Sequence, residues 1–486
     1  MREFEKRFWE YARYFLLLTL VYIVDGAIAQ EIDDGFSIER RSDGDWLHIH
    51  IADPTAYLSV NHPLSLFAQM RHATIYFPDR HLPIIPQNLT QHILNLGTSS
   101  FAITFSATFQ SNGDISDYTI QPSILKNIQH ISYANTGRIL KGDDEKSVFS
   151  KDLKDIKRLM DKHLEYRSNQ GALSTELVGE LNLDPYPFRD NAKSWISNTI
   201  NYPKIQLNND DADNNAKIMV SECMIVAGRV GARFLSKHKI PALYRRQDAP
   251  NLSTKELHEF EQIASKKDAK TAILPTVESR NLIPYLLQAT MDTKPGIHFA
   301  MGLDKAGYVK LTSPLRRYTD LMIHWNLKAF WSKTKYPFSE SDITMMIPRN
   351  AIIEKEIKEL SKYVDRYWLF EWIRRRQVLF NHSEIVKENA FLPHETELGI
   401  PRSWKWSRES NETLSEHPLY DAFILKIDKD KKYLKVAIPS LLNYTRRCYY
   451  RILSKEFFVG NKIKVCIGSV DPGTLDLKLD YMPNKS

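Results

Sequence analysis

Residues 24–35 read VDGAIAQEIDDG. This stretch holds four carboxylates within ten residues: Asp25, Glu31, Asp33 and Asp34. Apolar residues flank it on both sides, which indicates a strand end or loop beside a core. Carboxylates this close repel one another unless a cation lies among them, and hard oxygen ligands suit Mg²⁺ or Mn²⁺. Two other interpretations stay open: a polar surface turn, and a calcium loop, although the EF-hand spacing is absent.

The composition is that of a folded, mildly basic protein. The 486 residues are 43% hydrophobic and 26% charged, which excludes wholesale disorder. The net charge of +7 is compatible with a polyanionic partner and does not demand one. Three cysteines without CxxC spacing predict neither a zinc ribbon nor a disulfide framework. Since no apolar run reaches a membrane-spanning length, we expect no membrane partner.

The pattern of apolar residues predicts an α+β chain. Strands are expected within 16–60 and 100–122, and a set of short strands within 419–482. Helices are expected at 63–70, 146–168, 217–236, 313–332 and 351–380. His48 and His50 are expected to face opposite sides of a strand. The short C-terminal strands, with their basic, tyrosine-rich surface, predict a small OB-type barrel.

Seven further segments follow the acidic stretch in a specific order. They are IADPTAY (51–57), RHATIYFP (71–78), LPIIP (82–86), GAL (171–173), ECMI (222–225), HFAMGL (298–303) and TSPLRRYTD (312–320). In this order the set resembles the catalytic domain of the ribonuclease II (RNB) family of exoribonucleases, over about residues 20–335. The resemblance implies a large RNB-type catalytic domain of mixed sheets and helices, followed by the OB-type barrel.

The resemblance also implies a domain order and a metal site. We expect a truncated or divergent lead-in at 1–19, the catalytic domain at 20–382, a linker or insertion at 383–416 and an OB-type RNA-binding domain at 417–486. Asp25, Glu31, Asp33 and Asp34 would be the metal ligands, with Asp33 also catalytic. Glu31 departs from the aspartate that the family usually has there, and its extra methylene alters the ligand geometry.

Arg316 also has an argument from local sequence. Ser313 and Pro314 predict an N-cap and a first helical residue, which would put Arg316 in the first turn of a helix. A cation there opposes the helix dipole, so a phosphate would be its natural counter-charge. The alternative is a salt bridge to a nearby aspartate. The resemblance implies that Arg316 is catalytic and stabilises the phosphoryl transition state.

Several other residues are candidates for RNA contact. Tyr76 matches a family tyrosine that stacks on a base near the 3′ end, with a core tyrosine on a strand as the alternative. Arg317, Arg245, Arg446 and Arg447 are candidate RNA-binding cations, with solvated surface positions as the alternative. Residues 420–470 hold 11 Lys and Arg against 4 Asp and Glu, which favours a polyanion-binding barrel.

Two residues have an undecided role at this point. Asp53 could support the metal ligands from behind or cap a turn. Glu222 lies on an otherwise apolar helix face, so it needs a partner, either an arginine of the site or a purely structural one.

The predicted activity is hydrolytic, Mg²⁺- or Mn²⁺-dependent 3′→5′ degradation of single-stranded RNA to nucleoside 5′-monophosphates. Similarity to the organelle-type branch implies a mitochondrial location and an RNA helicase partner; the cytoplasm or nucleus is the other expectation. A catalytically weak or inactive RNA-binding scaffold is the main alternative. A secreted protein is a further one, resting on the apolar stretch before Ala29.

Overall fold

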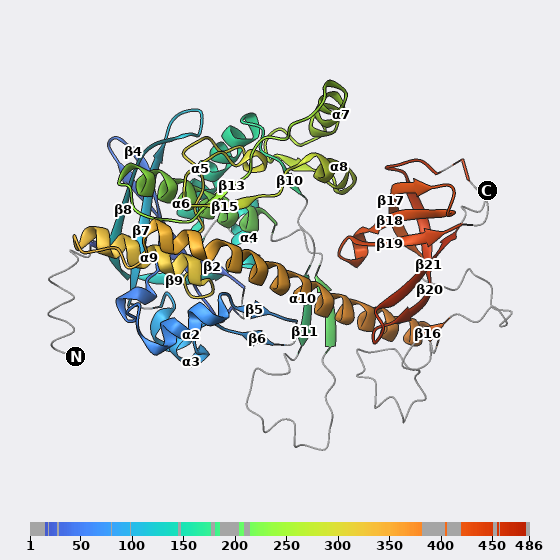
Figure 1. Ribbon diagram of the computed structural model, residues 1–486, viewed down its shortest axis with the longest axis horizontal. Coiled ribbons are helices and arrows are strands. Elements are labelled where there is room, and N and C mark those ends of the chain that lie inside the picture. Colours follow the sequence, from blue (N-terminus) through green and yellow to red (C-terminus); the bar gives the residue numbers. More distant parts are fainter. Residues whose placement is uncertain are drawn as a thin grey trace, which may run out of the picture.

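The computed structural model describes most of the chain. The described residues are 15–17, 19–26, 29–78, 80–97, 99–143, 147–175, 180–184, 204–208, 214–381, 404–405, 419–450, 454–455 and 457–482. Most of the predicted lead-in and linker therefore lies outside the described residues. Figure 1 shows a large α+β body and a small β body, joined by one long helix.

A curved seven-stranded sheet forms the centre of the large body, in the order β1-β8-β7-β4-β3-β2-β9. Its strands are β1 (Phe15–Leu17), β2 (Val21–Asp25), β3 (Asp34–Arg41), β4 (Gly44–Ala52), β7 (Ser99–Phe109), β8 (Ile115–Lys126) and β9 (Ile128–Ser132). Alternation of apolar residues produces these strands, because a period of two directs every second side chain into the core. The core includes Tyr22, Phe36, Ile49 and Phe105, which are fully buried.

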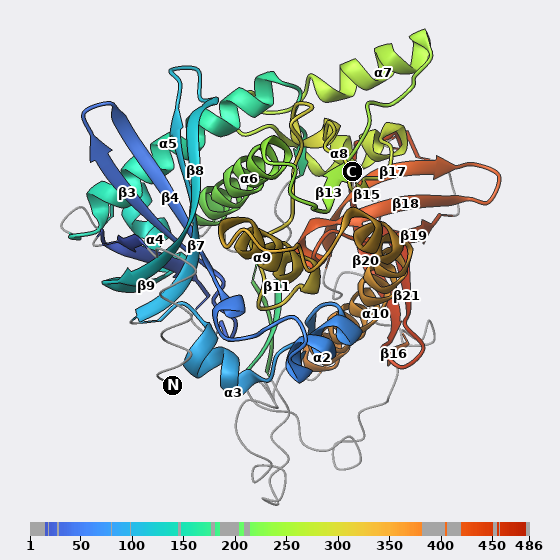
Figure 2. The ribbon, with the colours of Figure 1, turned by 60° about the vertical axis from the view of Figure 1, so that its left-hand side comes forward.

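Helices cover one face of this sheet and surround its ends. They are α2 (Pro63–Arg71), α3 (Gln87–Leu89), α4 (Tyr133–Lys141), α5 (Ser150–Asn169), α6 (Asn214–Lys237), α7 (Thr254–Ala264), α8 (Thr276–Leu282) and α9 (Tyr318–Trp331). Figure 2 shows α5 and α6 alongside the sheet, where α6 contacts β7 and β8. Short two-stranded ribbons complete the body: β5 (Ile75–Tyr76) with β6 (His81–Leu82), β10 (Ser174–Thr175) with β14 (Ile273–Leu274), β11 (Glu180–Asp184) with β12 (Lys204–Asn208), and β13 (Tyr244–Arg246) with β15 (Thr290–Asp292).

The helix α10 (Glu340–Asn381) connects the two bodies. It is longer than the predicted 351–380, because the backbone N–H and hydroxyl of Ser339 both donate to Asp342 and cap an earlier start. Leu360 of this helix is 45% exposed. The helix leaves the first body and contacts the strand β20 (Lys462–Asp471) of the second.

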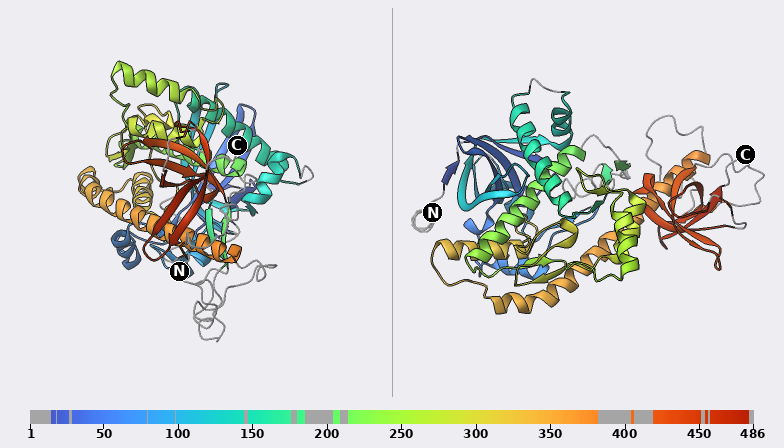
Figure 3. Two further views of the ribbon diagram at one scale, coloured as in Figure 1. Left: turned by 90° about the vertical axis from the view of Figure 1, so that its right-hand side faces the viewer. Right: turned by 90° about the horizontal axis from the view of Figure 1, so that it is seen from above.

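The small body is a closed five-stranded barrel, as the sequence predicts. Its strands are β17 (Tyr420–Asp428), β18 (Tyr433–Ile438), β19 (Tyr444–Tyr449), β20 (Lys462–Asp471) and β21 (Asp476–Met482). Closure comes from β21, which pairs parallel with β19 and antiparallel with β20. The short β16 (Trp404–Lys405) adds to β20. Figure 3 shows the barrel at one end of the molecule.

The expected orientation of His48 and His50 is wrong. The two rings stack with centroids 6.2 Å apart, because residues two apart in a strand share a face. His50 lies between Ser37 and Thr104, whose hydroxyls are 2.9 Å from its two ring nitrogens. Within the described residues, no helix is both long and apolar enough to cross a membrane.

Candidate active site

The four carboxylates lie where two neighbouring strands meet. Asp25 ends β2, and Asp34 begins the antiparallel β3, with Tyr22 paired to Phe36 between the two strands. Consecutive antiparallel strands end and begin at the same edge of a sheet, so the loop between them gathers the acidic side chains there. Asp34 pairs with Ile51 on β4, which anchors the far side of the loop to the core.

Asp33 is the most deeply buried of the four, with 3% of its surface exposed. Its Oδ1 accepts a hydrogen bond from the backbone N–H of Leu315 at 3.0 Å. Its Oδ2 is buried and has no hydrogen-bond partner within the described part of the chain. That oxygen lies 3.3 Å from Nε of Arg316, an ion-pair distance without the alignment of a hydrogen bond.

Arg316 reaches the carboxylates from a turn, and the predicted helix start at Ser313 is wrong. The helix α9 begins at Tyr318, after Arg317 in an extended conformation. The Asp320 carboxylate accepts the backbone N–H of Ser313 at 3.0 Å and also binds the Arg317 guanidinium. These contacts fold residues 313–317 back onto the helix start, so Arg316 is not subject to the first-turn dipole argument.

Backbone hydrogen bonds join the same turn to the segment that carries Tyr76. The N–H of Thr74 donates to the Arg316 carbonyl at 2.9 Å, and the N–H of Tyr318 donates to the His72 carbonyl at 2.9 Å. The hydroxyls of Thr74 and Tyr76 both donate to the Glu31 carboxylate. Sequence reasoning did not identify Thr74, although it lies within the quoted segment 71–78. Its only signal is its place two residues before Tyr76.

Burial and mutual repulsion both act on these acids. Burial is the largest cause that raises the pKa of Asp33 to about 7; the charges of Glu31 and Asp34 add to it, and Arg316 opposes it. Burial and then the charge of Asp25 raise the pKa of Asp34 to about 7. Burial also raises the pKa of Asp25 and Glu31. A cation bound here would relieve both effects.

The donor chemistry therefore suits a hard divalent cation. Within the described ranges, no group of three or more Asp, Glu, His or Cys side chains forms a preorganised metal site. That is compatible with Mg²⁺, which commonly takes one or two carboxylates and completes its shell with water and substrate phosphate. Oδ2 of Asp33, which is buried and accepts no hydrogen bond from the described residues, is the strongest single candidate ligand atom.

Other predicted residues lie outside this group. Arg317 is 24% exposed and pairs with Asp320. Arg245 lies on β13, where its N–H donates to the Tyr308 carbonyl at 2.8 Å. In the barrel, Arg446 pairs with Asp476 at 2.6 Å, whereas Arg447 is exposed, with its guanidinium 4.8 Å from the centroid of the Tyr433 ring. Contact of these four arginines with RNA stays a prediction.

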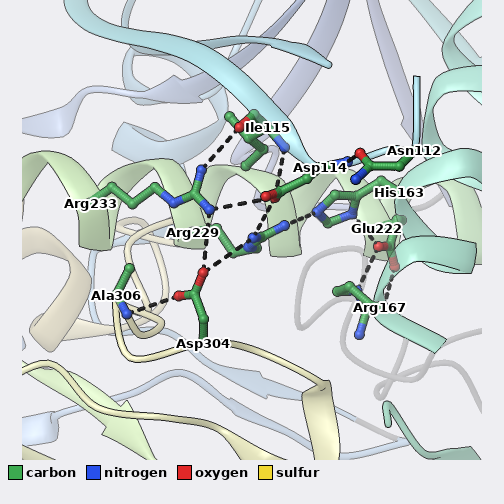
Figure 4. A network of polar contacts seen from close by, with 10 residues as sticks. All are labelled: Asn112, Asp114, Ile115, His163, Arg167, Glu222, Arg229, Arg233, Asp304 and Ala306. Carbon is green, nitrogen blue, oxygen red and sulfur yellow. Dashed lines mark hydrogen bonds and ion pairs between the residues drawn. The ribbon is translucent and has the colours of Figure 1, made fainter. Parts of the chain in front are cut away.

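Asp53 and Glu222 have structural partners. Asp53 is buried and forms an ion pair with Lys328 at 2.7 Å. Glu222 binds the guanidinium of Arg167 and the imidazole of His163 inside a network between α5, α6 and the β7–β8 turn (Figure 4). These partners favour the structural interpretation for both carboxylates.

Known proteins are similar to this chain in sequence. The RNB domain family matches residues 16–333, and the chain belongs to that family. It is 30% identical over 385 residues to the mitochondrial exoribonuclease II of Schizosaccharomyces pombe, covering 73% of this chain and 39% of the relative. The chain spans between 39% and 50% of the length of the first curated relatives that it matches.

Solved structures share the fold. An active-site mutant of the Dss1 exoribonuclease from Candida glabrata matches with a TM-score of 0.73 and 20% identity, over 99% of this chain and 57% of that one. Yeast Ssd1, described as a pseudonuclease, matches with a TM-score of 0.62 and 13% identity, over 98% and 54%. The fold alone therefore does not separate nucleases from proteins without that activity.

Proposed function

We propose that this chain is a 3′→5′ exoribonuclease that hydrolyses single-stranded RNA to nucleoside 5′-monophosphates. The observation that carries the proposal is the ion pair of buried Asp33 with Arg316 beside further acids, in which Oδ2 of Asp33 has no hydrogen-bond partner among the described residues. Membership of the RNB family and similarity to a protein named exoribonuclease II support the RNA substrate and the reaction class.

Each residue has a physical task in this reaction. Asp25, Asp33 and Asp34 would hold a divalent metal, Mg²⁺ or Mn²⁺. When bound, the metal would supply an activated water and neutralise charge on the scissile phosphate. Arg316, whose side chain is 41% exposed, would donate to the phosphate oxygens as negative charge develops. The exposed ring of Tyr76 would stack on a base near the 3′ end.

The barrel would add affinity for the RNA strand. Its basic side chains would follow the phosphates, and Tyr449, which is 57% exposed, would offer a stacking surface. Arg245 and Arg317 would contribute positive potential nearer the acidic loop. We also propose a mitochondrial location, supported by the name of the S. pombe relative. An RNA helicase is the partner that we propose from the resemblance to the organelle-type branch of the family.

A non-catalytic RNA-binding protein is the second candidate, because the fold is shared with a pseudonuclease. Retention of Asp25, Asp33, Asp34 and Arg316 favours the enzyme, since mutually repelling buried acids are costly without a cation to hold.

Product analysis on two labelled RNAs tests the proposal. An exonuclease acting from the 3′ end shortens 5′-labelled RNA progressively, and releases the label of 3′-labelled RNA at once as a nucleoside 5′-monophosphate. Binding of both RNAs without shortening of either, at millimolar Mg²⁺ or Mn²⁺, would support the non-catalytic candidate.

A further inference from the structure

We infer that Glu31 is a positioning residue that orients Tyr76 toward the 3′-terminal base, and not a ligand of the metal. The inference rests on the proposed function, because it assigns a role within the same site. It revises the metal-ligand role that the sequence implies for Glu31.

Both carboxylate oxygens of Glu31 accept hydrogen bonds from residues 74–76, the segment that carries the tyrosine. Oε1 accepts a hydrogen bond from the Thr74 hydroxyl at 2.9 Å, and Oε2 accepts one from the Tyr76 hydroxyl. Hydrogen bonds to a charged acceptor are among the stronger ones. The carboxylate is thus turned toward β5, while Oδ2 of Asp33 has no hydrogen-bond donor among the described residues.

The backbone behind Glu31 is held in place. The side chain of Asn95 donates to the Gln30 carbonyl at 2.9 Å and accepts the Ile32 N–H at 3.0 Å. The Gln30 amide oxygen lies 3.2 Å from Nδ1 of His81, whose ring packs edge-on to Tyr76 with centroids 4.8 Å apart. Residues 30–32 therefore contact the β5–β6 ribbon at two neighbouring residues, His81 and Tyr76.

The length of the glutamate matters to this contact. An aspartate carboxylate would be shorter by one carbon–carbon bond, about 1.5 Å, which is enough to break a hydrogen bond. With its hydroxyl held, the Tyr76 ring remains 39% exposed and can stack on a base. Fixing the ring before RNA binds reduces the entropy lost on binding.

Thr74 connects the contact between Glu31 and Tyr76 to the turn of residues 313–317, which carries Arg316. Its hydroxyl binds Glu31, while its N–H donates to the Arg316 carbonyl at 2.9 Å. The base clamp and the phosphate-binding arginine are therefore linked through a single residue. We expect this link to set where the last base lies relative to the scissile phosphate.

The test compares Glu31→Asp, Glu31→Gln and Tyr76→Phe with the wild type in the full chain. Dissociation constants for a single-stranded RNA are measured with EDTA, and the half-saturating Mg²⁺ concentration is measured in turnover. We expect each variant to weaken RNA binding about three- to tenfold, the effect of losing one hydrogen bond that orients a stacking ring. We expect the Mg²⁺ requirement to stay unchanged.

The Glu31→Asp variant separates the two roles of Glu31 most clearly, because it retains a carboxylate at the position where the family usually has aspartate. A metal ligand would tolerate that change, whereas the clamp would lose its contact. The double variant Glu31→Gln/Tyr76→Phe should bind RNA no more weakly than either single variant, since both remove one interaction.

The inference is overturned if Glu31→Asp binds RNA as the wild type does, or if Glu31→Gln raises the Mg²⁺ requirement tenfold. Additive losses in the double variant would also overturn it. Thermal unfolding shows whether a variant is misfolded. If Glu31→Gln is misfolded, the comparison with the wild type is made with Tyr76→Phe and Glu31→Asp. A wild type that never shortens RNA would defeat the proposed function, while the binding measurements would still decide the role of Glu31.

Discussion

The Nε atom of Arg316 lies 3.3 Å from Oδ2 of Asp33, a buried oxygen with no hydrogen-bond partner among the described residues. The other oxygen of Asp33 accepts the N–H of Leu315, the residue before that arginine. The Asp33 carboxylate thus contacts both the backbone of the 313–317 turn, at Leu315, and its charged side chain, Arg316. The acidic loop and the arginine turn are therefore joined through Asp33.

Replacing Arg316 should reduce catalysis much more than RNA binding. We expect Arg316→Ala to lower the single-turnover rate by about 100-fold or more, as for loss of other charged transition-state contacts. Arg316→Lys keeps the charge without the planar, bidentate fork, so its rate should lie in between. Equal losses in rate and in RNA affinity would show that Arg316 only binds the substrate.

The acidic loop should make the metal-free protein less stable as the pH rises. The pKa of Asp34 is raised by burial to about 7 when folded, against an unperturbed value of 3.8. Between these values the folded form retains a proton that the unfolded form has released, so stability falls as pH increases. Melting temperatures in EDTA across this range should fall more steeply for wild type than for Asp34→Asn.

Mg²⁺ should flatten that pH dependence, because a bound cation stabilises the ionised carboxylates of the folded state. The half-saturating Mg²⁺ concentration should rise as the pH falls below about 7, where protons compete with the metal. Identical pH slopes for wild type and Asp34→Asn, with and without Mg²⁺, would contradict both expectations.

Glu222 should contribute to stability through Arg167. Burial raises the pKa of Glu222, but Arg167 and His163 outweigh it and lower the value to about 2. Glu222→Gln leaves a buried guanidinium without its counter-charge, and we expect a loss of about 3–5 kcal/mol in the free energy of unfolding. Urea titration measures it. Adding Arg167→Met should cost less than the sum of the single changes; unchanged stability in Glu222→Gln would contradict this role.

Two neighbouring arginines of the barrel should behave differently. Arg447 is exposed, so Arg447→Gln should weaken RNA binding and reduce the slope of log affinity against log salt by about 0.7. Arg446 donates to Asp476 and to the Leu477 carbonyl, so Arg446→Gln should lower the melting temperature with less effect on that slope. The reverse pattern would place Arg446, and not Arg447, on the RNA.

Local sequence predicts much of this architecture. The apolar residues on both sides of the acidic stretch predict a strand end or loop beside a core, and the structure confirms this: Asp25 ends β2 and Asp34 begins β3. The five barrel strands follow from their alternation and turns. In each case the determining signal lies within a few consecutive residues.

The remaining features depend on partners that are distant in the sequence. The start of α9 is set by Asp320 and by pairing with the segment around Ala73, which the local Ser313-Pro314 signal does not reveal. Asp53 pairs with Lys328, and Glu31 with Tyr76, only once the chain has folded. Tertiary contacts of this kind override local helix signals and redirect side chains.

The most direct measurement is a time course with 5′-labelled single-stranded RNA and Mg²⁺, comparing wild type with Asp33→Asn. We predict stepwise shortening from the 3′ end by the wild type, and none by the variant, which should still fold and bind RNA. Equal shortening by both proteins would contradict the assignment of Asp33. Binding without shortening by either would contradict the proposed activity.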